Sequence, residues 1–400
     1  MKIKLNDALL KLIYISVIIA ALGQLRYQLT LNGNILSIYK FGIIVAILCS
    51  LLYLFIQFSN LTHTKKGVGI FSFAIICYLF YTVVASIAIN NNARIHPLSS
   101  VMDLLAWPLV LIVFYEYSRK NGIDENFKTI SIIGMITIMI FSVPNIRATI
   151  SGLTRKGGTI FPVYYCITLF PMILLFCSNK VKYSFMVIIL IILVASNKRA
   201  GTLAMITGIF VYFLINSVIS GTYEEKNKRK FQFIGVTILG LIAFYFINEN
   251  FDLAIIQKFE KLREDAGSNR IYIWQDVLKH FSQSNLFYKM LGHGFHSVYY
   301  QVKPLGMARL AHNSYLETLY DYGVIGTTIL IIIISYTVSI LKRMITEKNQ
   351  FAPILAYMLV QLAYLSLFSY FFDEANIIMP FAISWGIILG SYSHDKQVNG

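Results

Sequence analysis

The sequence predicts an all-α integral membrane protein with about twelve transmembrane helices and one large, partly helical extracytoplasmic loop. Three observations predict this fold class. Hydrophobic residues make up 57% of the 400 residues and charged residues only 13%, against about 25% charged in soluble proteins. Apolar segments near the length of about 20 residues that a bilayer requires recur along the chain. Only one connection between these segments is long.

The predicted spans start close to the basic N-terminus. Lys2 and Lys4 precede the first apolar run, which we interpret as an uncleaved helix because further spans follow and no cleavage site ends it. The four cysteines fall inside or at the end of apolar runs, which favours neither disulfides nor a thiolate metal site. The expected spans are residues 7–24, 37–58, 67–90, 100–118, 128–146, 158–177, 182–197, 200–220, 231–248, 323–341, 351–371 and 377–393.

The net charge is +15, and the placement of the basic residues matters more than their sum. If the N-terminus is cytoplasmic, 18 of the 34 Lys and Arg residues fall in inside segments. The short outside loops hold about 8, in agreement with the positive-inside rule. The charge is therefore explained without nucleic acid as a partner. This orientation places both termini in the cytoplasm and the long loop outside.

The chain divides into three parts: residues 1–248 with nine spans, the loop 249–322, and residues 323–400 with three spans and a cytoplasmic tail. The loop holds four of the seven histidines. Loops of this length in compact proteins are functional or disordered, and the aromatic and apolar content of this one favours a folded, functional loop. Two stretches in it predict helices, "FDLAIIQKFEKLRED" (251–265) and "RIYIWQDVLKHF" (270–281).

The second of these helices has Ser268 or Asn269 as its expected cap. Arg270 lies one turn before the apolar stripe of the helix, on the same side. A glycine-broken turn, "LGHGFHSVYYQ", follows. The residues of the apolar stripe are Trp274, Val277, Leu278 and Phe281.

The end of the loop, "AHNSYLETLYDYGVIG" (311–326), contains the best candidate for chemistry. Asn313 or Ser314 can cap a short helix that Gly323 ends. His312 then lies at the helix N-terminus, where partial positive charge disfavours the imidazolium form, so the neutral ring can accept a proton. The alternative is a satisfied polar residue near the interface. Glu317 has no evident role. The expected apolar side consists of Tyr315, Leu316, Leu319 and Tyr322.

Basic residues on the outer side can bind an anionic substrate, because guanidinium groups match phosphate oxygens bidentately. Arg199, next to Lys198 at the mouth of the eighth span, and Arg270 are the strongest candidates. For most of the others, anchoring to lipid headgroups is the simpler interpretation. These others are Arg26, Arg94, Arg147, Arg155 and Lys156.

No metal site is expected. His293 and His296 are spaced as H-x-x-H, yet they fall on a glycine turn, and the sequence has no H-E-x-x-H. The outer loop also has no D-x-D pair. Asp103, inside the fourth span, is either a functional residue or a solvated residue near a loop edge.

The stretch "HNSYLETLYDYGVIG" resembles the signature of the O-antigen ligase and polymerase superfamily, in which H-N-x-x-L-E leads through a glycine-bounded turn into a membrane helix. "RIYIW", "LGHGFHSV" and "SNKRAGTLAM" are similar to its arginine with a tryptophan four residues on, its turn before the catalytic histidine, and its helix-opening arginine. The span layout agrees over nearly the full length. The family commonly has Ser or Thr directly before that arginine, where this chain has Lys198.

The resemblance implies a bacterial inner-membrane enzyme that transfers a glycan from undecaprenyl diphosphate to an acceptor sugar hydroxyl on the outer face, with inversion and without a metal or cofactor. It implies His312 as the base and Arg199 and Arg270, with Lys198 and Arg155, as the diphosphate site. Its expected partners are the carrier-linked glycan, an acceptor glycan or glycolipid, membrane lipid, a flippase and a chain-length regulator.

Two activities compete within the family. A polymerase passes the chain to another carrier-linked repeat unit of an O-antigen, capsule or exopolysaccharide, whereas a ligase passes it to lipid A core. The motifs do not separate them, and we favour the polymerase because polymerases are the more numerous and varied members. A flippase or transporter is the alternative from another class. Transporters often contain repeated halves, and no such repeat is visible in this sequence.

Overall fold

A computed structural model describes residues 2–30, 33–61, 70–89, 97–150, 162–196, 199–220, 269–372 and 374–399, and a few positions between 227 and 245. These residues form helices and turns, without a strand among them, so the all-α prediction is confirmed for this part of the chain. The helices are α1 (Lys2–Thr30), α2 (Gly33–Leu61), α3 (Ile70–Ile89), α5 (Pro97–Asn121), α6 (Phe127–Ile150), α7 (Pro162–Phe176), α8 (Asn179–Ala195), α9 (Arg199–Ile219), α12 (Arg270–Gln283), α13 (Leu286–Leu291), α14 (Ser314–Thr346), α15 (Ala352–Phe368) and α16 (Ala375–Asn399).

Eight of the described helices are long and apolar enough to cross a membrane, which makes the chain a multi-pass membrane protein. Each predicted span outside 231–248 overlaps one described helix, whereas 231–248 lies mostly outside the described residues. The number of twelve spans therefore stays a prediction. The eight segments are Leu5–Arg26, Ile38–Gln57, Phe71–Ile89, Val101–Asn121, Phe127–Pro144, Ala200–Ile219, Ser314–Thr346 and Ala375–Val398, and two shorter apolar helices are Tyr164–Phe176 and Ala352–Phe368.

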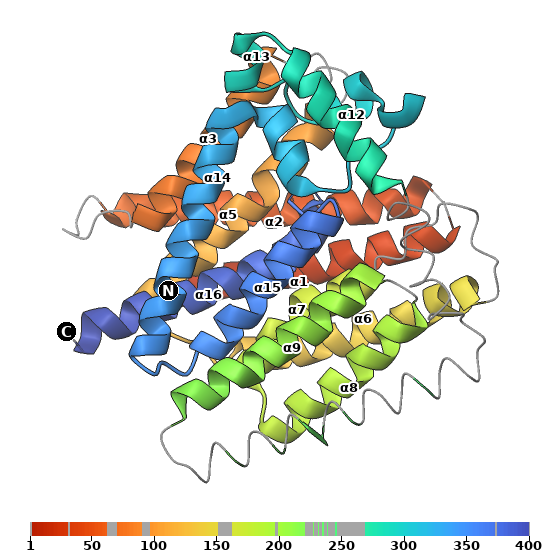
Figure 1. The fold of residues 1–400 in the computed structure, drawn as a ribbon. Coiled ribbons are helices and arrows are strands. Elements are labelled where there is room, and N and C mark those ends of the chain that lie inside the picture. Colours follow the sequence, from red (N-terminus) through yellow and green to blue (C-terminus); the bar gives the residue numbers. More distant parts are fainter. Residues whose placement is uncertain are drawn as a thin grey trace.

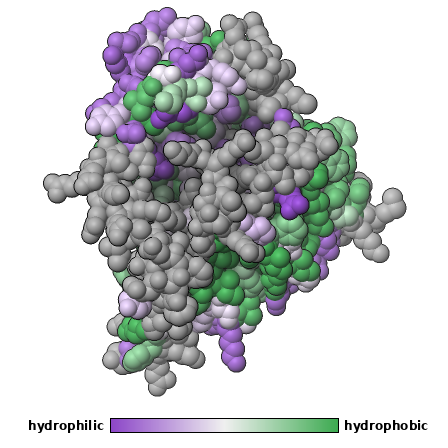
Figure 2. All heavy atoms as spheres, turned by 90° about the vertical axis from the view of Figure 1, so that its right-hand side faces the viewer, coloured by the Kyte–Doolittle hydropathy of each residue, from purple (hydrophilic) through white to green (hydrophobic). Residues whose placement is uncertain are grey.

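The bundle exposes large apolar side chains on its outer surface. Phe55 is 74% exposed, Phe80 70% and Ile140 62%. An apolar surface of this kind is unfavourable in water and suits a lipid environment. Figure 2 shows the same division, with hydrophobic residues along the side of the bundle and hydrophilic residues gathered at its upper end. The membrane-facing region and the polar end are therefore distinct parts of the molecule.

Helices α5 and α16 form an enclosed pair at the centre of the bundle. An 18-residue stretch within the span Val101–Asn121 is 83% buried, and one within Ala375–Val398 is 100% buried. Small residues let two helix backbones approach closely in a membrane. A Cβ added to Gly386 would lie 2.7 Å from the Leu111 carbonyl oxygen, and one added to Gly390 would clash with that of Tyr115. The glycines therefore permit the close contact of these two helices.

Residues 269–322, called the cap below, fold into a small unit at the end of the bundle where α12 and α13 lie (Figure 1). The cap has its own apolar core between α12, a five-residue π-helical turn (298–302) and the start of α14. The predicted helix 270–281 is confirmed as α12, while the predicted helix 251–265 lies outside the described residues. The core consists of Ile273, Val277, Val298, Val302, Ala311 and Tyr320, with Trp274, Phe281 and Leu316 packed against it.

The predicted apolar faces in this region are correct only in part. In α12, Leu278 is 46% exposed and Ile273 is buried instead, because the buried face centres on Ile273 and Val277, and Leu278 lies one position further around the helix. In α14, Leu319 is half-buried while Glu317 is fully buried. The stretch 314–322 is the part of the cap that adjoins the bundle, so its polar side is enclosed as well.

The cap is fixed to α3 and α14 by hydrogen bonds. The Tyr81 hydroxyl donates to the carbonyl oxygens of Leu291 and Tyr322, each at 3.0 Å. The backbone N–H of Phe295 donates to the Ser86 hydroxyl at 3.3 Å. Because Tyr81 and Ser86 both belong to α3, this helix sets the position of the cap on the bundle.

Two glycines let the cap touch a break in α14. Gly323 has φ 63° and ψ −168°, which lie outside the helical region, so the predicted stop at Gly323 is confirmed as a helix break. Gly292 has φ 84°. A Cβ at Gly292 would clash with the Asp321 carbonyl group, and a Cβ at Gly323 would lie 2.5 Å from the Gly292 nitrogen. Only glycine fits both positions.

We expect Gly292→Ala to lower the melting temperature in detergent further than Gly306→Ala does. Both glycines have a positive φ, 84° and 72°, which is unfavourable for alanine by about 1–2 kcal/mol or more. No heavy atom lies within 4 Å of a Cβ at Gly306, however. The Gly292 variant carries in addition the clash with Asp321, expected to cost about 1–3 kcal/mol. Thermal unfolding followed by intrinsic fluorescence measures it, and equal shifts would contradict the close contact.

Candidate active site

His312 lies where the cap meets the bundle. It is half-buried and directly precedes the first residues of α14. Its backbone is in the left-handed region, with φ 52°, a conformation that costs a non-glycine residue about 1–2 kcal/mol. Contacts on both sides of the residue must stabilise this conformation.

The side that follows His312 is stabilised by the N-terminal capping residue of α14. Asn313 accepts the backbone N–H groups of Tyr315 at 3.1 Å and Leu316 at 3.2 Å, so of the two predicted capping residues it is Asn313 that acts. Ser314 instead binds the turn between α15 and α16. Its hydroxyl donates to the Ser369 carbonyl oxygen at 3.3 Å and accepts a backbone N–H of the same turn at 2.6 Å. The start of α14 is therefore fixed to the bundle.

The residue before His312 has its backbone bonded on two sides. The Trp274 indole donates to the Ala311 carbonyl oxygen at 3.0 Å, and the Ala311 N–H donates to the Glu317 carboxylate. Ala311 and Glu317 are both fully buried. No role for Glu317 followed from the sequence, because Glu317 does not share the helical face of His312, whereas its contact is with the backbone one residue earlier.

Arg270, the first residue of α12, is half-buried and lies on the helix that contacts the Ala311 segment. Its charge acts on the Tyr164 hydroxyl of α7, and the side chains of Tyr164 and Ser369 share a hydrogen bond. Ser369 in turn accepts the bond from Ser314. One turn further along α12, Trp274 bonds the residue before His312. Helix α12 therefore carries Arg270 one turn before the residue that bonds the His312 segment, while the role of Arg270 stays a prediction.

Arg199 is the first residue of α9, in agreement with its predicted place at a helix start. Helix α9 packs along α15, with the Gln361 side chain donating to the Ala204 carbonyl oxygen at 2.8 Å. In Figure 1, α9 begins at the end of the bundle that faces α12 and ends at the opposite side. The start of α9 thus lies on the side of the cap. Lys198 and Arg155 lie outside the described residues.

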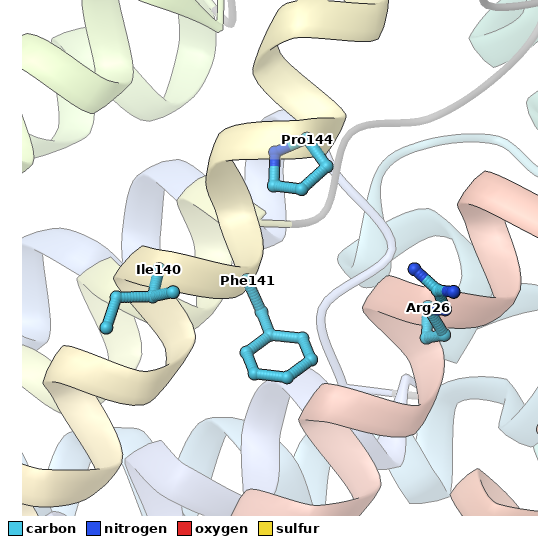
Figure 3. A pocket seen from close by; sticks show the side chains of 4 residues that line it. All are labelled: Arg26, Ile140, Phe141 and Pro144. Carbon is cyan, nitrogen blue, oxygen red and sulfur yellow. The ribbon is translucent and has the colours of Figure 1, made fainter.

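A separate hollow of about 230 Å³ lies between α1 and α6 and is lined by Arg26, Ile140, Phe141 and Pro144. Figure 3 shows Arg26 on α1 across the hollow from Phe141 and Pro144 on α6. Arg26 is exposed at the end of the apolar span Leu5–Arg26, a position that suits the predicted anchoring to lipid headgroups. None of the lining residues belongs to the cap.

The two histidines of the glycine turn have packing roles. The His293 ring lies between the rings of Tyr288 and Tyr320, with centroid distances of 4.5 and 4.4 Å, and its Nε2 is hydrogen-bonded to the Ser284 hydroxyl at 2.8 Å. Burial lowers the pKa of His293, so the ring is neutral at pH 7. The His296 ring stacks on Phe295 with a centroid distance of 4.0 Å.

Asp321 organises this turn from within α14. Its fully buried carboxylate accepts the backbone N–H groups of His296 at 2.7 Å, Ser297 at 3.0 Å and Val298 at 3.3 Å. Three such bonds compensate the burial of a carboxylate. The sequence did not single out this residue, because a lone acidic residue among aromatic ones carries no signal of a buried contact.

These features define a multi-pass membrane protein in which a folded polar cap joins an apolar bundle near His312. Residues 184–331, from α8 to the middle of α14, match the family model described as O-antigen ligase. This segment belongs to that family, and the resemblance to the O-antigen ligase and polymerase superfamily is confirmed. It contains Arg199, Arg270 and His312, and it makes the chain a glycosyltransferase-type enzyme. No curated protein matches the sequence significantly.

Proposed function

We propose that the protein is a bacterial polysaccharide polymerase that transfers a growing glycan from undecaprenyl diphosphate to a sugar hydroxyl of another carrier-linked repeat unit. The observation that supports this most is the position of His312. It precedes the N-terminus of α14 at the junction of cap and bundle and lies inside the matched family segment. Trp274, one turn after Arg270 on α12, bonds the residue before His312.

In the proposed reaction the acceptor hydroxyl oxygen attacks the anomeric carbon and forms the new glycosidic bond. The bond from that carbon to the carrier diphosphate breaks, and its electron pair leaves with the diphosphate. His312 takes the hydroxyl proton as general base. Attack from the face opposite the leaving group inverts the anomeric centre.

Cationic side chains stabilise the charge that develops on the leaving diphosphate. The position of Arg270 at the start of α12, half-buried and one turn before Trp274, supports this role. Arg199 at the start of α9 is the second cation, and Lys198 and Arg155 complete the diphosphate site. Partial burial strengthens such pairing because water screens it less.

The proposed orientation places the cap on the outer face of the bacterial inner membrane, with both chain termini in the cytoplasm. The distribution of basic residues supports it, and the separation of polar cap and apolar bundle in Figure 2 agrees with a cap outside the lipid. The division into residues 1–248, 249–322 and 323–400 follows from the same orientation. A flippase that delivers the donor and a chain-length regulator are the expected protein partners.

We expect the purified protein to lengthen glycans when carrier-linked repeat units are the only substrate. Gel analysis of the products, with a His312→Ala sample as the blank, then shows a ladder of increasing length. Products that form only when lipid A core is added would show that the enzyme is a ligase and not a polymerase. Movement of the donor across a vesicle membrane without a new glycosidic bond would favour a flippase.

A further inference from the structure

We propose that Trp274 and Glu317 are positioning residues that orient the His312 ring by fixing the backbone of Ala311 from opposite sides. This inference rests on the proposed role of His312 as general base. The sequence motifs gave neither residue a part in the reaction, because their positions in the sequence do not predict a contact with His312.

Both polar backbone groups of Ala311 are hydrogen-bonded, and their partners come from two different helices. Its carbonyl oxygen, which belongs to the peptide bond leading into His312, accepts the indole N–H of Trp274 from α12 at 3.0 Å. Its N–H donates to Glu317 from α14. Ala311 is fully buried, so water is not the partner of either group. The peptide plane that enters His312 is therefore fixed by the cap and by α14 together.

The other end of His312 is fixed by the capping residue of α14. Asn313 is bonded to Tyr315 and Leu316, which leaves His312 as the single residue between two restrained neighbours. Its left-handed φ of 52° is the conformation that joins them. Loss of either restraint on Ala311 allows His312 to relax toward an ordinary backbone region, and this turns the ring away from its present direction.

The burial of Glu317 supports a specific role. Its side chain is fully buried in a region with an apolar core, where leucine would pack without the cost of removing a carboxylate from water. What leucine lacks is an acceptor for the Ala311 N–H. Trp274 is likewise half-buried at the edge of the cap core, where phenylalanine would pack similarly but lacks the N–H donor.

Trp274 also connects the two parts of the proposed active site. It lies one turn after Arg270 on α12, so the helix that carries the diphosphate cation also fixes the segment that carries the base. General base catalysis needs the ring nitrogen within hydrogen-bond reach of the acceptor hydroxyl. A displacement of about 1 Å can reduce the rate about 100-fold. The pair of bonds on Ala311 therefore affects the rate of the chemical step rather than donor binding.

The test compares Glu317→Ala, Glu317→Gln and Trp274→Phe in the polymerisation assay. We expect Glu317→Ala and Trp274→Phe to lower kcat by about 10-fold to 100-fold with the KM for the donor nearly unchanged, as loss of alignment predicts. The amide oxygen introduced by Glu317→Gln can still accept the Ala311 N–H, so this variant should retain most of the activity. The double variant should lose less than the product of the single effects, because both residues act on the same backbone.

Asp276→Ala is the matched control. Asp276 also lies on α12, and its carboxylate accepts the backbone N–H of Leu305 at 2.9 Å; Leu305 has a left-handed φ of 58°. The control removes the same kind of bond from the same cap but not from the histidine segment, so kcat should stay close to that of the unmodified enzyme.

Three results would overturn the positioning role: full activity in Trp274→Phe, equal losses in Glu317→Gln and Glu317→Ala, or an equal loss in Asp276→Ala. Trp274→Phe keeps the aromatic packing and decides the question if Glu317→Ala does not fold. The His312→Ala variant separates the role of the base from the role of its positioning residues. If it is inactive while the Trp274 and Glu317 variants are fully active, only the positioning role fails. If His312→Ala is active, the proposal that His312 is the base and the proposal that Trp274 and Glu317 position it are both refuted.

Discussion

Replacing His312 by alanine is expected to abolish glycan transfer while the protein still inserts into the membrane and folds. A positioned general base contributes about 100-fold to 10,000-fold to a rate. His312 lies between two residues whose hydrogen bonds fix their positions, Ala311 and Asn313. The substitution removes the proton acceptor but leaves the capping of α14 and the bonds on Ala311 in place. The loss should therefore appear in kcat rather than in stability.

The measurement is the rate of glycan lengthening by detergent-purified protein, with equal amounts of folded enzyme confirmed by thermal unfolding. His280→Ala is the control, because His280 is exposed on α12 and its ring bonds only the Asp276 carbonyl oxygen among the contacts identified. It should retain full activity. Activity in His312→Ala within a few-fold of the unmodified enzyme would remove His312 as the base.

Arg270→Ala is expected to have the second largest effect, on both the KM for the donor and kcat. Removing one donor that stabilises developing negative charge costs about 100-fold to 1,000-fold in kcat. Arg270 meets the conditions for such a role, because it is half-buried and its charge already acts on Tyr164, a neighbour of the Ser369 turn. Arg270→Lys should be intermediate, since lysine keeps the charge but not the planar fork that matches two phosphate oxygens.

Initial rates at varied donor concentration separate an effect of Arg270→Ala on the KM for the donor from an effect on kcat. Lys279→Ala on the exposed side of the same helix is the charge-matched control, and it should leave donor use unchanged. Arg199→Ala should also weaken donor use strongly, as expected for the second cation of the diphosphate site. An unchanged dependence on donor concentration in both Arg199→Ala and Arg270→Ala would refute the diphosphate site.

The sequence predicted the membrane helices well because the lipid environment imposes a simple rule. A helix must present an uninterrupted apolar length to the hydrocarbon, and this is visible in the sequence without any tertiary contact. Gly323 as a break and Asn313 as a capping residue were predictable for a similar reason, since both depend on local backbone chemistry. The joint role of Arg270 and His312 rests instead on resemblance to a family and stays a prediction.

The polar interior of the cap was not predictable from periodicity. Glu317 and Asp321 do not belong to the buried face that the sequence predicts, because charged residues are normally solvated. Both are fully buried here and accept backbone N–H groups. The partner of Glu317 lies six residues earlier, and the bonds of Asp321 reach back more than twenty residues. A single sequence contains no signal that pairs these positions.

The break at Gly323 has a mechanical consequence. In a bilayer, helices tilt as the thickness of the membrane changes, and a continuous helix would transmit that tilt along its whole length. In α14 the helical backbone is interrupted at Gly323, and the Thr327 hydroxyl donates to the Gly323 carbonyl oxygen at 2.8 Å. The part that crosses the lipid can therefore pivot at this point while the first nine residues stay bonded to the cap. We therefore expect a change in membrane thickness to disturb the geometry around His312 less than it would if α14 were a continuous helix.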